Sequence, residues 1–298
     1  MSRHKDGRAR ARFLRRVRRQ RLKYVAMLPA LVTILNGVCG FGSLLLASKG
    51  HFAGAGYLIF MAMIADMLDG RLARMSHSTS SFGGQLDSLC DVVSFGAAPA
   101  FLMVQIVEFK LSLQLADTPG LHFMQRFIWL AAAVYLSCAI IRLARFNVEN
   151  EEDETAHMSF VGLPTPAAAG TVVSLVIFHQ EIVLPAVGGV YGALDHSLVY
   201  SLPFAVFGMG ILMVSRIRYP HILNVYLKGK KPFDHLIRAI LFLGVIVWNR
   251  QAALAVIFCL FTSGSPVKWV YLRALRKTGA VAVSSPGQPD SQPDGRPC

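Results

Sequence analysis

ADMLDGRLARMSHSTSSFGGQLDSLCD, residues 65–91, places four aspartates between stretches of sequence that are otherwise strongly apolar. Asp66 and Asp69 stand three positions apart, and Asp87 and Asp91 stand four positions apart. Residues at these spacings share one face of an α-helix, with side chains about 5–6 Å from each other. The stretch therefore predicts two helices, each carrying a pair of carboxylates, joined by the polar loop SHSTSSFGG at 76–84.

The chain as a whole is apolar. Of its 298 residues, 54% are hydrophobic and only 16% are charged, and the mean hydropathy is +0.47. A soluble domain of this length needs more charge on its surface. We therefore predict an all-α polytopic membrane protein, whose apolar runs are long enough to cross a hydrocarbon core of about 30 Å.

Eight apolar runs are candidate spans: the first six are longer, and the two short C-terminal ones would add about two extra helices. The last two runs are short and separated only by Asn249 and Arg250, which predicts a tight helical hairpin. The eight runs are 28–47, 52–68, 86–106, 127–145, 164–184, 198–215, 236–248 and 251–263. We divide the chain into a basic arm at 1–24, a transmembrane domain at 25–220, a hairpin with a basic segment at 221–278 and a disordered tail at 279–298.

The positive charge is concentrated at the N-terminus. The net charge is +13, and residues 1–24 hold eleven Lys and Arg against one Asp. Cells retain Lys and Arg on the cytoplasmic side of a membrane, and a basic arm beside a span is attracted to anionic lipid. A nucleic-acid partner is disfavoured, because the basic run adjoins a transmembrane span and is not repeated elsewhere.

The other cations fit one orientation. With the arm inside, the opposite connections carry only Lys49, Lys110, Arg126 and Arg250. An even number of spans then places both termini in the cytoplasm. We expect the membrane to be the inner (cytoplasmic) cell membrane. The cations on the side of the arm are Arg71, Arg74, Arg142, Arg145, Arg216, Arg218, Lys228, Lys230, Lys231, Lys268, Arg273, Arg276 and Lys277.

Under this topology the two acidic pairs meet at the cytoplasmic edge of the membrane. Four carboxylates in a partly dehydrated site repel one another unless cations are present. Oxygen-only ligands favour Mg²⁺ or Mn²⁺, and four acids suit two ions about 4 Å apart, an arrangement used in phosphoryl chemistry. Gly70 and Gly83 would let a bulky ligand approach the backbone, and Arg74 could hold a phosphate.

Two other interpretations of the acids are open. They could be solvated at the membrane edge, with some of them paired to Arg71 and Arg74, although their spacings and interleaved glycines favour a functional site. They could also carry protons or cations in a transporter. That function predicts acids near the middle of the membrane and pseudo-repeats between the two halves, and the sequence shows the acids at one edge and no repeat.

The spacing of the aspartate stretch identifies a family. Without gap or substitution, the sequence reads Asp66-x2-Asp69-Gly70-x2-Ala73-Arg74-x8-Gly83-x3-Asp87-x3-Asp91. This pattern resembles the signature of the CDP-alcohol phosphotransferase family. The resemblance implies a bundle of six core transmembrane helices, usually dimeric, that displaces CMP from a CDP-linked alcohol with a hydroxyl acceptor.

The resemblance implies a role for each position of the motif. The four aspartates would bind two Mg²⁺ or Mn²⁺ ions, and Asp91 would also be the general base that removes the proton of the acceptor hydroxyl. Gly70, Ala73, Arg74 and Gly83 would bind the CDP-alcohol, with the three small residues lining the cytidine pocket and the arginine holding phosphate.

Three further stretches resemble the branch of the family that joins CDP-diacylglycerol to L-serine. They are LPALVTILNGVCGFGS at 28–43, RLARFN at 142–147 and FVGLPTPAAAG at 160–170. The first has Ala30 where an asparagine commonly follows the proline, whereas Thr33 and Asn36 are in place. The resemblance implies CDP-diacylglycerol, L-serine and membrane lipids as partners, and a homodimer.

The acceptor depends on residues outside the aspartate motif. A serine zwitterion needs a cation for its carboxylate, and Arg142 and Arg145, with Asn147 beside them, are the candidates. Alternatively, these arginines anchor the fourth span by contacting lipid phosphate. Sister transferases that use glycerol 3-phosphate or an inositol phosphate are a further alternative, and they should need more positive charge in the acceptor pocket.

Overall fold

The computed structural model describes residues 29–76, 81–112, 119–152, 162–186, 192–217, 219 and 249–277. Within these ranges the chain forms helices and no strand, and seven helices are long and apolar enough to cross a membrane. The predicted all-α polytopic class is confirmed. The basic arm at 1–24, the predicted span at 236–248 and the tail at 279–298 lie outside the described residues.

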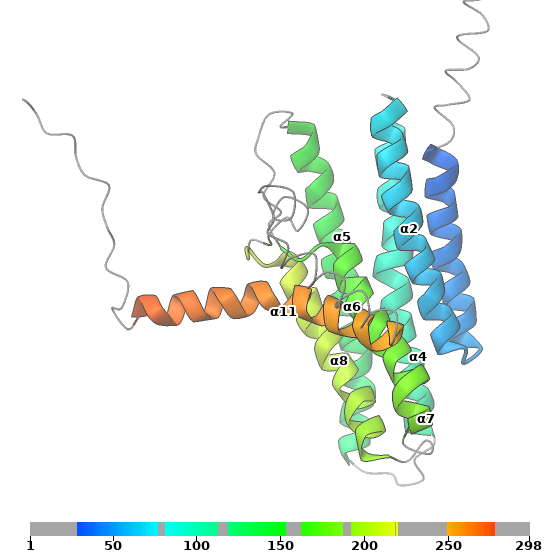
Figure 1. The fold of residues 1–298 in the computed structure, drawn as a ribbon, viewed down its shortest axis with the longest axis vertical. Helices are drawn as coiled ribbons and strands as arrows, with labels where there is room; N and C mark the ends of the chain where they lie inside the picture. The colour runs from blue at the N-terminus through cyan, green and yellow to red at the C-terminus, as the bar shows by residue number, and fades with distance from the viewer. Residues whose placement is uncertain are drawn as a thin grey trace, which may run out of the picture.

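The helices form a bundle in which α2, α4, α5 and α8 run side by side, and α11 crosses them and extends beyond the bundle (Figure 1). The first helix spans Pro29–Ser48. The elements that follow are α2 (Phe52–Ser76), α3 (Ser81–Asp91), the π-helical turn η1 (Val92–Ala97), α4 (Ala98–Ser112), α5 (Pro119–Glu152), α6 (Thr165–Phe178), the π-helical turn η2 (His179–Val183), α7 (Leu184–Ala186), α8 (Ala193–Val214) and α11 (Arg250–Lys277).

The helices that carry the aspartates extend beyond the predicted spans. The run predicted at 52–68 continues as α2 to Ser76, and the run predicted at 86–106 begins with α3 at Ser81. Hydropathy marks where the residues are apolar, whereas a helix continues as long as its backbone hydrogen bonds are made. The described residues of the loop predicted at 76–84, which are Ser76 and 81–84, are therefore helical, and all four aspartates lie within helices.

A π-helical turn follows Asp91 directly, because η1 joins α3 to α4 without a break. Pro99, the second residue of α4, has no N–H to donate to the carbonyl of Phe95. The hydroxyl of Tyr135 on α5 donates to that carbonyl at 3.0 Å, and both side chains are fully buried. α5 thereby holds the distorted turn that follows the acidic motif.

α11 is much longer than the span predicted at 251–263. It contains Pro266 and still continues to Lys277. Pro266 cannot donate to the carbonyl of Thr262, but the hydroxyl of Tyr219 does so at 3.3 Å. The hydroxyls of Thr262 and Thr171 also lie 2.7 Å apart, which fastens α11 to α6.

Small residues let the first helix approach the third span closely. A Cβ added to Gly40 would lie 2.7 Å from the Cα of Ser94, and one added to Gly37 would lie 3.0 Å from the Sγ of Cys90. No side chain larger than hydrogen fits at Gly40 without a shift of the backbone. The polar side chains of the first helix therefore reach the acidic end of α3.

Lys110 corrects one sequence expectation. We predicted it in a connection between spans, but it lies in α4 with only 4% of its surface exposed. Its Nζ donates to the carboxylate of Asp195 at the start of α8, which is fully buried and also contacts His179. α4 stays helical to Ser112, and a buried ammonium requires an opposite charge. This ion pair lies at the end of the third span opposite to Asp91.

We expect Lys110→Met to lower the free energy of unfolding by about 3–5 kcal/mol, because it leaves the Asp195 carboxylate buried without its cation. The double variant Lys110→Met/Asp195→Asn should recover part of this loss, because it removes both charges. Thermal unfolding in detergent micelles measures the effect, with the exposed Lys49→Met as the control. A double variant less stable than Lys110→Met would contradict this account of the pair.

Candidate active site

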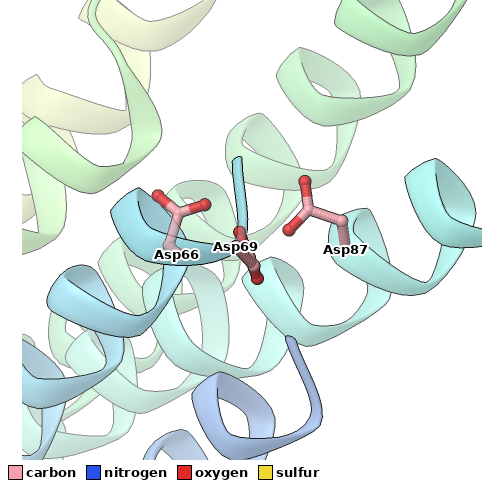
Figure 2. A group of neighbouring side chains, drawn as sticks. All are labelled: Asp66, Asp69 and Asp87. Carbon is pink, nitrogen blue, oxygen red and sulfur yellow. The ribbon is translucent and has the colours of Figure 1, made fainter. Parts of the chain in front are cut away.

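Three of the four predicted aspartates converge between α2 and α3 (Figure 2). One oxygen of each of Asp66, Asp69 and Asp87 lies within 4.8 Å of the other two. Asp69 is 4% exposed, and the other two are half-buried. The i, i+3 spacing puts the first two on one face of α2, and α3 presents the third to that face. The structure therefore brings the predicted helix pair together at its acidic faces.

This group of carboxylates fits a divalent cation. Oδ2 of Asp69 and Oδ1 of Asp87 are buried and receive no hydrogen bond from any residue that the structure describes. Buried acceptors without a partner are unfavourable, and close carboxylates repel one another. Mg²⁺ or Mn²⁺ would relieve both, because each takes carboxylate oxygens as ligands. Asp66, Asp69 and Asp87 are the residues that could hold such an ion.

Asp91 has a different partner from the other three aspartates. Its Oδ1 accepts a hydrogen bond of 2.9 Å from Nδ2 of Asn36 on the first helix. Asn36 is fully buried, and Asp91 is 7% exposed. Asp91 is not a member of the three-carboxylate cluster. The sequence places Asn36 in a family-like stretch but assigns it no role, because nothing in the sequence pairs it with α3.

The remaining residues of the motif lie beside the cluster. A Cβ added to Gly70 on α2 would meet no atom within 4 Å, so the backbone next to Asp69 faces open space. Gly83 lies in the first turn of α3. Ala73 and Arg74 continue α2 by one turn, and their side chains lie outside the described part of the chain.

The predicted acceptor residues all lie on α5, and each has different surroundings. Arg142 is half-buried, and its Nη1 donates to Oγ1 of Thr165 at 2.9 Å. Asn147 accepts a hydrogen bond of 3.0 Å from the hydroxyl of Ser88, which follows Asp87 in α3. Arg145 is exposed. The structure thus ties Asn147 to the acidic helix and Arg142 to the start of α6.

Sequence reasoning missed Thr165, although it lies in the family-like stretch FVGLPTPAAAG. The start of α6 is fixed by Gly162, whose φ of +91° suits glycine and whose added Cβ would lie 2.3 Å from the carbonyl oxygen of Met213. The N–H of Gly162 donates to the carbonyl of Ile217 at 2.9 Å. Gly162 was the sequence feature that could have indicated this contact. A close approach of two chain segments at this glycine places Thr165 against Arg142.

These features define an integral membrane protein with a carboxylate site built between its second and third spans. Comparison with known families places it more narrowly. Residues 26–212 match the CDP-alcohol phosphatidyltransferase family, which is more than half of the chain. The chain belongs to this family of membrane enzymes.

Individual relatives are similar over most of their length. A CDP-diacylglycerol–serine O-phosphatidyltransferase of Helicobacter pylori is 30% identical over 246 residues, covering 83% of this chain and 92% of the relative. The Bacillus subtilis protein of the same name is 30% identical over 194 residues, covering 65% and 90%. An archaetidylserine synthase of Methanothermobacter thermautotrophicus is 33% identical over 201 residues, covering 65% and 70%.

We expect Asp69→Asn and Asp87→Asn each to weaken Mn²⁺ binding by at least about 10–100-fold, the loss that even an outer partner of a metal site causes. Electron paramagnetic resonance of free Mn²⁺ over detergent-solubilised protein measures the affinity. Glu108→Gln is the control, because Glu108 lies in α4 and outside the acidic cluster. Unchanged Mn²⁺ affinity in both aspartate variants would refute the metal assignment.

Proposed function

We propose that this protein transfers the phosphatidyl group of CDP-diacylglycerol to the hydroxyl of L-serine, which gives phosphatidylserine and CMP. The observation that carries the proposal is the cluster of Asp66, Asp69 and Asp87 in a chain of the CDP-alcohol phosphatidyltransferase family. The choice of acceptor is supported by the relatives, because all three are named for serine or a serine-containing product.

The reaction exchanges one phosphorus–oxygen bond for another. The serine hydroxyl oxygen attacks the β-phosphorus, which carries the diacylglycerol. The bond from that phosphorus to the bridging oxygen breaks, and CMP leaves with the bridging oxygen and its electron pair. The proton of the hydroxyl passes to a base on the protein, so no oxidant or reductant is needed.

Asp66, Asp69 and Asp87, completed by Asp91, are the residues that would hold a pair of Mg²⁺ or Mn²⁺ ions. When bound, the cations supply positive charge that offsets the charge of the diphosphate and of the departing CMP. Helices α2 and α3 fix the carboxylates relative to one another, so the chain determines where this positive charge would lie. Gly70, whose α-carbon faces open space, lets the substrate approach that site.

Asp91 is the base in this proposal. A carboxylate that is fully engaged by metal is a weak base, and a general base must be within hydrogen-bond reach of the proton it removes. Asp91 stands outside the three-carboxylate cluster and is held by the amide of Asn36 instead. Of the four aspartates, Asp91 is therefore the one that metal would engage least.

The other motif residues bind the two substrates. Ala73 and Gly83, together with Gly70, leave room for the cytidine, and Arg74 holds phosphate. Arg142, with Asn147 and Arg145 on the same helix, binds the serine carboxylate, because a guanidinium matches a carboxylate with two parallel hydrogen bonds. The site and both termini face the cytoplasm, and two chains associate as a homodimer.

We expect purified protein supplied with CDP-diacylglycerol and Mn²⁺ or Mg²⁺ to release CMP with L-serine, and not with glycerol 3-phosphate or an inositol phosphate. Chelation of the metal should abolish turnover. Asp91→Asn should lower kcat by about 100–10,000-fold, the usual contribution of a general base. CMP release with another acceptor but none with L-serine would overturn the serine assignment, and turnover in excess chelator would overturn the metal proposal.

Gly70→Ala separates substrate binding from packing. Replacing a helical glycine by alanine should stabilise the fold by about 0.5–1 kcal/mol, but the new methyl group would occupy the cytidine pocket. We expect the KM for CDP-diacylglycerol to rise about tenfold, which corresponds to about 1.4 kcal/mol. Gly208→Ala on α8 is the matched control, because a Cβ there also meets no atom within 4 Å. Equal KM values for the two variants would contradict the pocket assignment.

A further inference from the structure

We infer that Asn36 is a positioning residue for this reaction: its side-chain amide holds the carboxylate of Asp91 in the place and direction from which it removes the proton of the acceptor. The inference rests on the proposed function, in which Asp91 is the base. It adds a residue of the first helix, outside the aspartate motif, to the machinery of the site.

The contact joins two buried side chains that are far apart in the sequence. Nδ2 of Asn36 donates to Oδ1 of Asp91 at 2.9 Å across a separation of 55 residues. Asn36 is 0% exposed, and Asp91 is 7% exposed. A hydrogen bond to an ionised carboxylate is about twice as strong as one between neutral groups. In a buried site it therefore fixes which way the carboxylate points.

The amide of Asn36 gives the two oxygens of the Asp91 carboxylate different roles. An ionised carboxylate only accepts hydrogen bonds, and an asparagine Nδ2 only donates them. The amide therefore engages Oδ1 of Asp91 and leaves Oδ2 as the better placed oxygen for the incoming proton. A carboxylate free to rotate would present either oxygen in many directions, and proton transfer requires one alignment.

The backbone of Asn36 is fastened to the third span. Its backbone carbonyl accepts a hydrogen bond of 2.9 Å from the hydroxyl of Ser94, which lies in η1 just beyond Asp91. Gly37 and Gly40 on either side of this contact allow the first helix to touch the third span, as their added Cβ atoms would lie 3.0 Å or less from Cys90 or Ser94. The backbone from which the amide extends is therefore set by packing of the first helix against the third span.

The same hydrogen bond distinguishes Asp91 from the three clustered carboxylates. Asp69 and Asp87 each keep a buried oxygen that no described residue satisfies, which is the condition that attracts a cation. Oδ1 of Asp91 already has a donor. Asn36 thus selects which of four similar carboxylates acts as the base, and its loss should impair turnover without weakening the cluster.

Asn36→Leu tests the inference, because it removes the donor while keeping a similar volume. We expect kcat to fall about 100-fold, with KM for serine and for CDP-diacylglycerol within about threefold of wild type. Mn²⁺ affinity, measured by electron paramagnetic resonance, should stay unchanged, because the three clustered carboxylates are untouched. Thr171→Val controls for lost stability, because it removes a buried contact between α6 and α11 away from the site.

The exchange variant Asn36→Asp/Asp91→Asn tests whether the carboxylate must lie on α3 for turnover. It keeps one amide and one carboxylate in contact, so its thermal midpoint should rise above that of Asn36→Leu. Its carboxylate is on the wrong helix, so its kcat should stay as low as that of Asp91→Asn. Recovery of kcat together with stability would show that the carboxylate can act from the first helix, which would contradict Asp91 as the base that Asn36 positions.

The outcomes distinguish the inference from the function on which it rests. A wild-type protein that turns over while Asn36→Leu keeps its kcat would overturn the inference alone. An exchange variant with wild-type kcat would overturn the assignment of Asp91 as the base, and this inference with it. Loss of Mn²⁺ binding in Asn36→Leu would also overturn it, because Asn36 would then act through the metal cluster. A wild-type protein that releases no CMP with any acceptor would overturn the proposed function and this inference with it.

Discussion

An ionised carboxylate inside a bundle of apolar helices needs an opposite charge or a hydrogen-bond donor, and this constraint governs both ends of the bundle. At one end Asp195 has the ammonium of Lys110 and the imidazole of His179. At the other end the clustered aspartates keep buried oxygens without a donor in the described chain. The first arrangement is closed and binds helices together. The second is incomplete in the protein itself, which is what a binding site for a cation requires.

The backbone obeys the same constraint. A proline within a membrane helix leaves a carbonyl without its usual N–H, and water is absent from the hydrocarbon core to replace it. Tyr135 donates a hydrogen bond to the carbonyl that Pro99 leaves without a donor. Tyr219 does the same for the carbonyl that Pro266 leaves without one. In both cases a tyrosine from another part of the chain supplies the donor. The π-helical turn behind Asp91 and the long α11 both depend on such tertiary contacts.

The sequence predicts the spans and the acidic cluster because each rests on a local pattern. Hydropathy finds the apolar runs, and the i, i+3 and i, i+4 spacings place the aspartates on helix faces. The burial of Lys110 and the contact of Asn36 with Asp91 join residues 85 and 55 positions apart, and no local pattern encodes such pairs. The hydrogen bond from Tyr135 on α5 to the π-helical turn is also a long-range contact that no local pattern encodes.

The four-residue spacing between Asp87 and Asp91 explains how one short helix can serve two purposes. Four residues advance an α-helix by about 6 Å and turn it by about 40° beyond a full turn. The two carboxylates therefore share one side of α3 but face different neighbours. Asp87 meets the pair on α2, and Asp91 meets Asn36 on the first helix. A spacing that aligned both carboxylates with α2 would leave Asp91 without the contact to Asn36. In the proposed function, this geometry lets Asp87 face the metal site while Asp91 is held by the amide of the first helix for proton transfer.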